Sequence, residues 1–137
     1  MEAFEVMGRH LLRRDGDILF VRFRGAVDIG EMQLLFAAMV QMQEKNPVVF
    51  HLYDGSQAGL TTPEARRWAA ENLSGVHRAA GIACYGVNAV VRAIAQLHTR
   101  AIALFSKQPD VPMVFFATEV EARAWIDRQR TLRQATP

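Results

Sequence analysis

Val114-Phe115-Phe116-Ala117-Thr118-Glu119-Val120-Glu121 is the stretch that decides the fold. Its first half is a short apolar run, which is typical of a buried β-strand. Its second half is a capping box, in which the Thr118 side chain accepts a hydrogen bond from the Glu121 N–H and the Glu121 carboxylate accepts one from the Thr118 N–H. The stretch therefore predicts a strand that runs straight into a helix.

Similar helix-opening signals occur earlier in the chain. Asp28-Ile29-Gly30-Glu31 and Thr61-Thr62-Pro63-Glu64 have the same offset between a capping residue and an acidic one, and Asn88 can also cap a helix. We expect helices over about 28–45, 61–73, from 88 to a break at 108–110, and from 118 onward. Apolar strands are expected at 48–53, 81–85 and 113–117.

A hairpin precedes this alternating pattern. Residues 11–14 and 18–23 flank Asp15-Gly16, a dipeptide typical of a two-residue type I′ turn. Because strand–helix–strand crossovers are right-handed and leave their strands parallel, the later strands should form a parallel sheet. The sequence thus predicts an α/β fold: a mixed, mainly parallel five-stranded sheet with an N-terminal antiparallel hairpin and four main helices. Trp68 and Trp125 fall on the apolar stripes of their helices and are expected to be largely buried.

Length and composition indicate one domain, residues 1–137. Half of the 137 residues are hydrophobic, which suits a folded domain with a substantial core. The net charge of +2 is too small to indicate a nucleic-acid partner. Cys84 is the single cysteine, so no intrachain disulfide can form, and a cytoplasmic location is expected. The longest apolar region, 87–105, contains Arg92 and Arg100 and is expected to be a buried helix rather than a transmembrane segment.

The order of elements resembles the STAS domain, a family that includes anti-sigma factor antagonists and cytoplasmic domains of sulphate transporters. The likeness is to its SpoIIAA-like branch, whose β-α superhelix is shared with CRAL-TRIO lipid carriers. Two segments carry it, Thr61-Thr62-Pro63-Glu64-Ala65-Arg66-Arg67 and the stretch from Val114 to Ile126. The resemblance implies a non-enzymatic regulatory module with a regulatory protein as its partner.

In classical antagonists, a phosphorylatable serine stands at the start of the helix after the third core strand, in an Asp-Ser-Ser/Thr-Gly setting. The matching stretch here is Asp54-Gly55-Ser56-Gln57-Ala58-Gly59. It keeps Asp54 and Ser56 but lacks the pair of adjacent hydroxyl residues followed by glycine. The resemblance therefore implies the location of a phosphorylation or partner site, and the chemistry at this location departs from the family pattern.

The physical argument points to the same place. In an open α/β sheet, ligands favour the edge at which the parallel strands end. Free N–H groups at the start of the helix after 61 could hold an anion, although hydroxyl residues there can also be simple caps. The candidate residues of this rim are Asp54, Gly55, Ser56, Thr61 and Thr62.

The third helix has an unusually wide apolar face. Its predicted sheet-facing stripe consists of Val90, Ile94, Leu97, Ala101, Leu104 and Phe105. Val91, His98 and Ile102 widen this stripe on one flank. The flank is either packed on a neighbouring helix, or it is a homodimer contact or a groove for an apolar small molecule.

The remaining polar residues give no catalytic or metal signature. The four histidines have no acidic or cysteine neighbours at metal-ligand spacing, so no metal or cofactor is expected. His51 reads as a hydrogen-bonded core residue and Cys84 as an inert buried thiol. The arginines of the hairpin are expected to protect an exposed sheet edge, with an acidic partner as the alternative. An enzyme is not expected. A small carrier for a lipid or other apolar ligand remains the alternative to the module, and it would need an internal cavity of about 300 Å³ or more.

Overall fold

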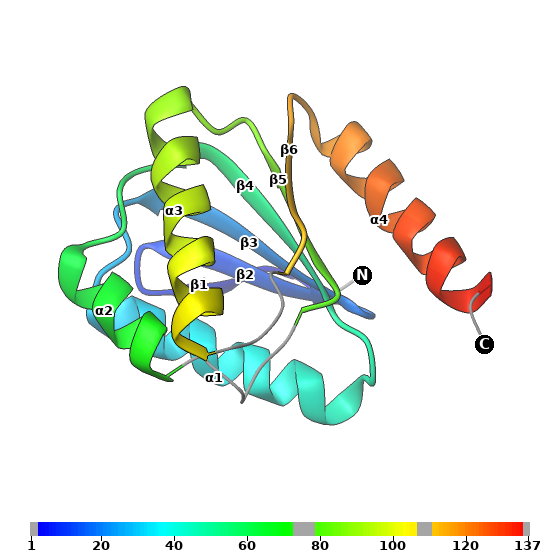
Figure 1. The fold of residues 1–137 in the computed structure, drawn as a ribbon, viewed down its shortest axis with the longest axis horizontal. Helices are drawn as coiled ribbons and strands as arrows, with labels where there is room; N and C mark the ends of the chain where they lie inside the picture. The colour runs from blue at the N-terminus through cyan, green and yellow to red at the C-terminus, as the bar shows by residue number, and fades with distance from the viewer. Residues whose placement is uncertain (1–2, 73–78, 107–110, 136–137) are drawn as a thin grey trace.

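The computed structural model describes residues 3–72, 79–106 and 111–135, and for 98, 99 and 101–106 it describes the backbone only. These described residues form one six-stranded sheet with four helices (Figure 1). In chain order the elements are β1 (Glu5–Met7), β2 (His10–Asp15), β3 (Ile18–Gly25), α1 (Ile29–Lys45), β4 (Phe50–Ala58), α2 (Pro63–Asn72), β5 (Gly81–Tyr85), α3 (Ala89–Ser106), β6 (Met113–Phe116) and α4 (Glu119–Ala135).

The strands follow one another across the sheet in the order in which they occur in the chain. β1, β2 and β3 are antiparallel, whereas β3, β4, β5 and β6 are parallel. This confirms the mixed, mainly parallel α/β sheet, its N-terminal hairpin and its four helices. The sheet has six strands rather than the expected five. The additional strand, β1, is only three residues long, and its residues Glu5-Val6-Met7 carry no periodic pattern that would predict it.

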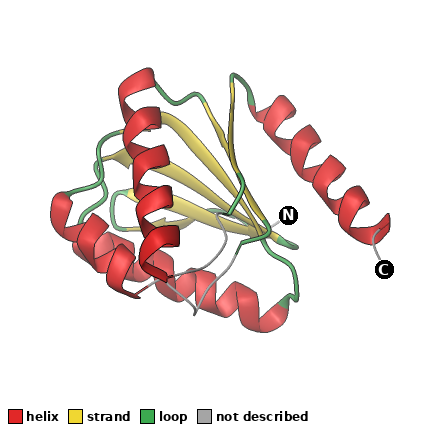
Figure 2. Ribbon diagram, in the orientation of Figure 1, coloured by secondary structure: helices red, strands yellow, loops and turns green. Residues whose placement is uncertain are grey.

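Helices lie on both sides of the sheet, with α4 on the side away from the other three (Figure 2), and each face carries its own core of side chains. β3 alternates between the two faces: Leu19 and Val21 belong to a core with α1 and α2, whereas Phe20 belongs to a core with Ala122 and Ile126 of α4. α3 packs beside α2. Burial on both faces explains the near-continuous apolar character of the central strands.

The position of the hairpin turn and the burial of two tryptophans differ from the predictions. Asp15 pairs with Ile18, so Gly16 and Asp17 form the hairpin turn, one residue later than expected. Gly16 occupies the first turn position with a φ of 61°, a conformation that glycine adopts without steric cost. Trp68 and Trp125 are partly rather than largely buried, and each packs at the margin of its core.

The predicted sheet-facing stripe of α3 is wrong at Val90 and Leu97, whereas the side chains of its members Ala101, Leu104 and Phe105 lie outside the described part of the structure. Val90 is 65% exposed and Leu97 is 64% exposed. The described α3 residues that are partly buried are Val91, Ile94, Ala95 and Gln96. An apolar face this wide does not determine which of its sides turns inward, and packing beside α2 decides it.

Candidate functional site

The rim at the carboxyl ends of the parallel strands brings several predicted residues together. Asp54 lies opposite Arg22 of β3 and Tyr85 of β5 in the sheet register. Its Oδ1 accepts hydrogen bonds from the Ser56 N–H at 3.0 Å and from the Ser56 hydroxyl at 2.7 Å. Its Oδ2 lies 3.6 Å from Nε of Arg22. Ser56 itself is exposed, so its hydroxyl is held in place and remains accessible.

Tyr85 adds a hydrogen-bond donor beside Asp54. Its hydroxyl donates to Oε1 of Glu119, at the start of α4, over 3.3 Å. Burial raises the pKa of Tyr85 well above its ordinary value, and the carboxylates of Asp54 and Glu119 raise it further. The hydroxyl therefore stays protonated and serves as a donor between two acids.

The segment predicted as a loop from Asp54 is largely strand. β4 continues to Ala58, with a register shift against β3 that lies between the pairs made by Arg22 and Arg24. Neither Gly55 nor Gly59 has a positive φ. They are needed for close packing instead, because a Cβ at Gly55 would collide with Val87 and one at Gly59 would lie 2.8 Å from the Ala26 nitrogen.

Thr62, one of the two threonines predicted as possible caps, caps α2. Its Oγ1 accepts from the Ala65 N–H at 3.2 Å, and its carbonyl accepts from the Arg66 N–H at 3.0 Å. Ala65, not Glu64, therefore occupies the third helical position, and the predicted pairing with Glu64 does not form. The Thr61 carbonyl accepts from the Arg66 side chain.

The other predicted caps are present. The Asp28–Glu31 capping box is complete, and the Asn88 side chain accepts from the Val91 N–H at 3.0 Å. Thr118 accepts from the Glu121 N–H at 3.3 Å. The return bond of this box differs from the prediction, since the Glu121 carboxylate accepts from the Thr118 hydroxyl at 3.0 Å.

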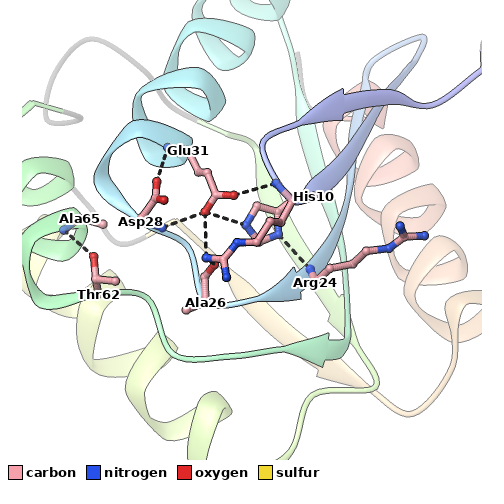
Figure 3. A network of polar contacts seen from close by, with 8 residues as sticks. His10, Arg24, Ala26, Asp28, Glu31, Thr62 and Ala65 are labelled. Atoms are coloured by element: carbon pink, nitrogen blue, oxygen red, sulfur yellow. Dashed lines mark hydrogen bonds and ion pairs between the residues drawn. The ribbon is translucent and has the colours of Figure 1, made fainter.

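A buried polar network that the sequence does not predict lies next to the rim (Figure 3). Glu31 is 5% exposed and His10 is fully buried. Glu31 accepts from the Arg9 N–H at 2.8 Å and from the Asp28 N–H at 3.0 Å, and the Arg9 guanidinium lies 3.4 Å away. Nε2 of His10 lies 3.2 Å from the same carboxylate. The capping-box pattern reveals Glu31, but nothing in the sequence pairs it with a turn 22 residues earlier.

Burial by itself would raise the pKa of Glu31. The hydrogen bonds from the Arg9 and Asp28 backbones, the Arg9 side chain and the nearby His10 outweigh it. They lower the pKa of Glu31 from 4.5 to about 2. Glu31 is therefore a fully ionised carboxylate inside the fold at neutral pH.

The flank of α3 was predicted as an apolar contact formed by Val91, His98 and Ile102. Val91 is partly buried. The side chains of His98 and Ile102 lie outside the described part of the structure.

His51 and Cys84 have the surroundings expected of core residues. Nδ1 of His51 lies 2.7 Å from the Tyr53 hydroxyl, and His51 is 2% exposed. Burial raises the pKa of Cys84 to about 12, so its thiol is unreactive. Among the described residues, no three His, Cys, Asp or Glu side chains form a group that could hold a metal ion. In the same parts of the chain, no helix has the length and apolar character needed to cross a bilayer.

The hairpin arginines do not act as one group. Arg14 pairs with Glu5 of β1 at 2.5 Å. Arg13 pairs with Asp15 at 2.9 Å. Arg13 and Arg22 both flank the ring of Phe4, with Cζ 4.4 and 4.5 Å from its centroid. These two guanidinium groups thus form part of the aromatic packing on the α4 side of the sheet.

Comparison with solved structures finds this fold in the anti-sigma factor antagonist SpoIIAA in its unphosphorylated form. The match covers 93% of this chain and 98% of that chain, with a TM-score of 0.52 and 17% sequence identity. The chain therefore has a SpoIIAA-like fold, as the order of its elements predicted. No family profile matches the chain. No curated protein matches it either.

Proposed function

We propose that this protein is a non-enzymatic, cytoplasmic regulatory module that binds a protein partner through the rim at the carboxyl ends of its parallel strands. The observation that carries the proposal is the exposed Ser56 hydroxyl, held by Asp54 at 2.7 Å. The fold, shared with an anti-sigma factor antagonist, adds support. A phosphate at Ser56 would add about two negative charges beside Asp54. Repulsion between the phosphate and the Asp54 carboxylate would change the surface that a partner meets.

Exposed apolar side chains near the helix starts also favour the rim as a binding surface. Each helix follows the carboxyl end of a strand, so all four helices begin on the side of the molecule where the rim lies. Exposed apolar side chains lie within or just before each first turn: Ile29, Leu60, Val90 and Val120. Such residues next to a polar centre are typical of protein–protein contacts.

The carrier alternative gains no support from the described residues. The described apolar side chains on each face of the sheet form one contiguous core cluster. Side chains that fill both faces of the sheet favour an interaction module over a ligand carrier.

The test is recovery of protein partners by wild type and by variants in a pull-down from the source cells. We expect Ser56→Glu and Leu60→Asp each to reduce recovery of the same partner, with the fold intact. Leu34→Asp is the matched control for Leu60→Asp, since Leu34 is 53% exposed in the middle of α1 and Leu60 is 44% exposed. Equal recovery of every partner by all four proteins would contradict the proposal.

A further inference from the structure

We propose that Glu31, together with His10 and Arg9, is a positioning residue that sets the backbone geometry of the rim. The inference gains its meaning from the proposed function of the rim. The positioning itself is a property of the free chain and is tested without a partner.

The first step of the argument is the segment between β3 and α1, residues 24–28. The Arg24 N–H donates to Nδ1 of His10 at 2.9 Å, and the Ala26 carbonyl accepts from the Arg9 guanidinium at 2.8 Å. The Asp28 N–H donates to Glu31 at 3.0 Å. The segment is therefore bonded at three points to one polar network, whose members His10 and Glu31 are buried (Figure 3).

The second step leads from this segment to the rim. The Gly59 N–H donates to the Gly25 carbonyl at 2.9 Å, and the Thr62 N–H donates to the Val27 carbonyl at 3.0 Å. Gly59 also approaches the Ala26 backbone so closely that no side chain would fit between them. The two strand-to-helix connections are thus bonded to each other, and the first of them is also bonded to Glu31, His10 and Arg9.

The chemistry of the network requires a carboxylate. Glu31 receives N–H donors on both oxygens, with the Arg9 N–H on Oε2 and the Asp28 N–H on Oε1. A glutamine has one acceptor oxygen, so its NH₂ group would face one of these donors and leave it unpaired. Glu31→Gln therefore disrupts the network while keeping the size and shape of the side chain.

If Glu31 only stabilised the fold as a whole, its replacement would lower global stability without a local effect on the rim. Amide hydrogen exchange distinguishes this purely structural role from the positioning role. The rim is reported by the amides of Gly59 and Thr62. Two amides at the opposite end of the sheet serve as the reference, since the Phe50 N–H donates to the Asp17 carbonyl and the Ala80 N–H donates to the Val49 carbonyl. Met42→Ala is the control variant, because Met42 is buried in the same core near the far end of α1.

In Glu31→Gln we expect exchange at Gly59 and Thr62 to accelerate about tenfold more than at Phe50 and Ala80. Arg9→Ala should act in the same direction with a smaller factor. The Arg9 side chain is 60% exposed, so we expect this variant to fold, and it decides the question if Glu31→Gln fails to fold. Met42→Ala should accelerate all four amides alike.

Equal acceleration of rim and reference amides in Glu31→Gln and Arg9→Ala would overturn the positioning role. The result also separates the two proposals. Faster exchange at the rim, combined with partner recovery that no rim variant changes, would leave the positioning intact and refute the proposed binding surface.

Discussion

Glu31 connects local and long-range structure within one side chain. It completes the capping box of α1 with Asp28, a contact over three residues, and it also receives the Arg9 N–H from a turn 22 residues earlier. Gly8 in that turn has a φ of 62°, and a Cβ there would lie 2.6 Å from Cγ of Glu31. A glycine is thus required for two separate reasons at one position.

Comparison of two glycines separates these reasons. Gly16 has nearly the same φ, 61°, but a Cβ there would meet nothing within 4 Å. Either substitution by alanine should cost about 1–2 kcal/mol of backbone strain. Gly8→Ala should cost about 1–3 kcal/mol more, because the added methyl group overpacks against Glu31. Urea denaturation of both variants measures the difference, and equal losses would show that Glu31 moves aside freely.

At the scale of elements, strands and caps were predictable and the rotation of a helix was not. The central strands and the caps at Asp28, Thr62, Asn88 and Thr118 depend on a few neighbouring residues. The orientation of α3 depends on what packs against it, so its wide apolar face predicted the wrong stripe. The last strand shows the same effect, since Phe115 was expected in the core and is only partly buried.

Truncation of two phenylalanines tests this difference between strands. Phe50 of β4 is fully buried, and Phe50→Ala should cost about 3–5 kcal/mol. Phe115 of the edge strand β6 is partly exposed, with Arg92 Cζ 4.8 Å from its ring centroid. Phe115→Ala should therefore cost about half as much. Thermal unfolding ranks the two variants, and a larger loss for Phe115→Ala would contradict the described burial.

At the scale of the whole molecule, side chains from distant segments join the fold. Arg130 of α4 binds both oxygens of Asp17, 113 residues earlier, at 2.9 and 2.5 Å. This pair fastens the last helix to the β2–β3 turn. Glu31 joins α1 to the start of β2 in a comparable way, and its ionisation connects the stability of the entire fold to pH.

The acid stability of the molecule should depend on Glu31. Its pKa is about 2 in the fold and about 4.5 when unperturbed, so the folded state favours the ionised form. Its contribution is fully present above about pH 4.5 and is lost as the pH falls toward 2. The difference in unfolding free energy between wild type and Glu31→Gln should shrink over this interval. Denaturation curves at pH 6, 4 and 2.5 measure it, and a difference independent of pH would exclude this role.

The sequence by itself determined the α/β class, the hairpin, the four helices and the location of the rim, because periodicity and caps depend on residues close together in the chain. It also indicated Asp54 and Ser56 as candidate residues of this rim. Only the tertiary structure decided the sixth strand, the rotation of α3, and the joining of His10, Arg9 and Glu31 behind the rim. These features arise from contacts between segments that the chain brings together only when it folds. Their geometry depends on the packing of the whole molecule rather than on any local pattern.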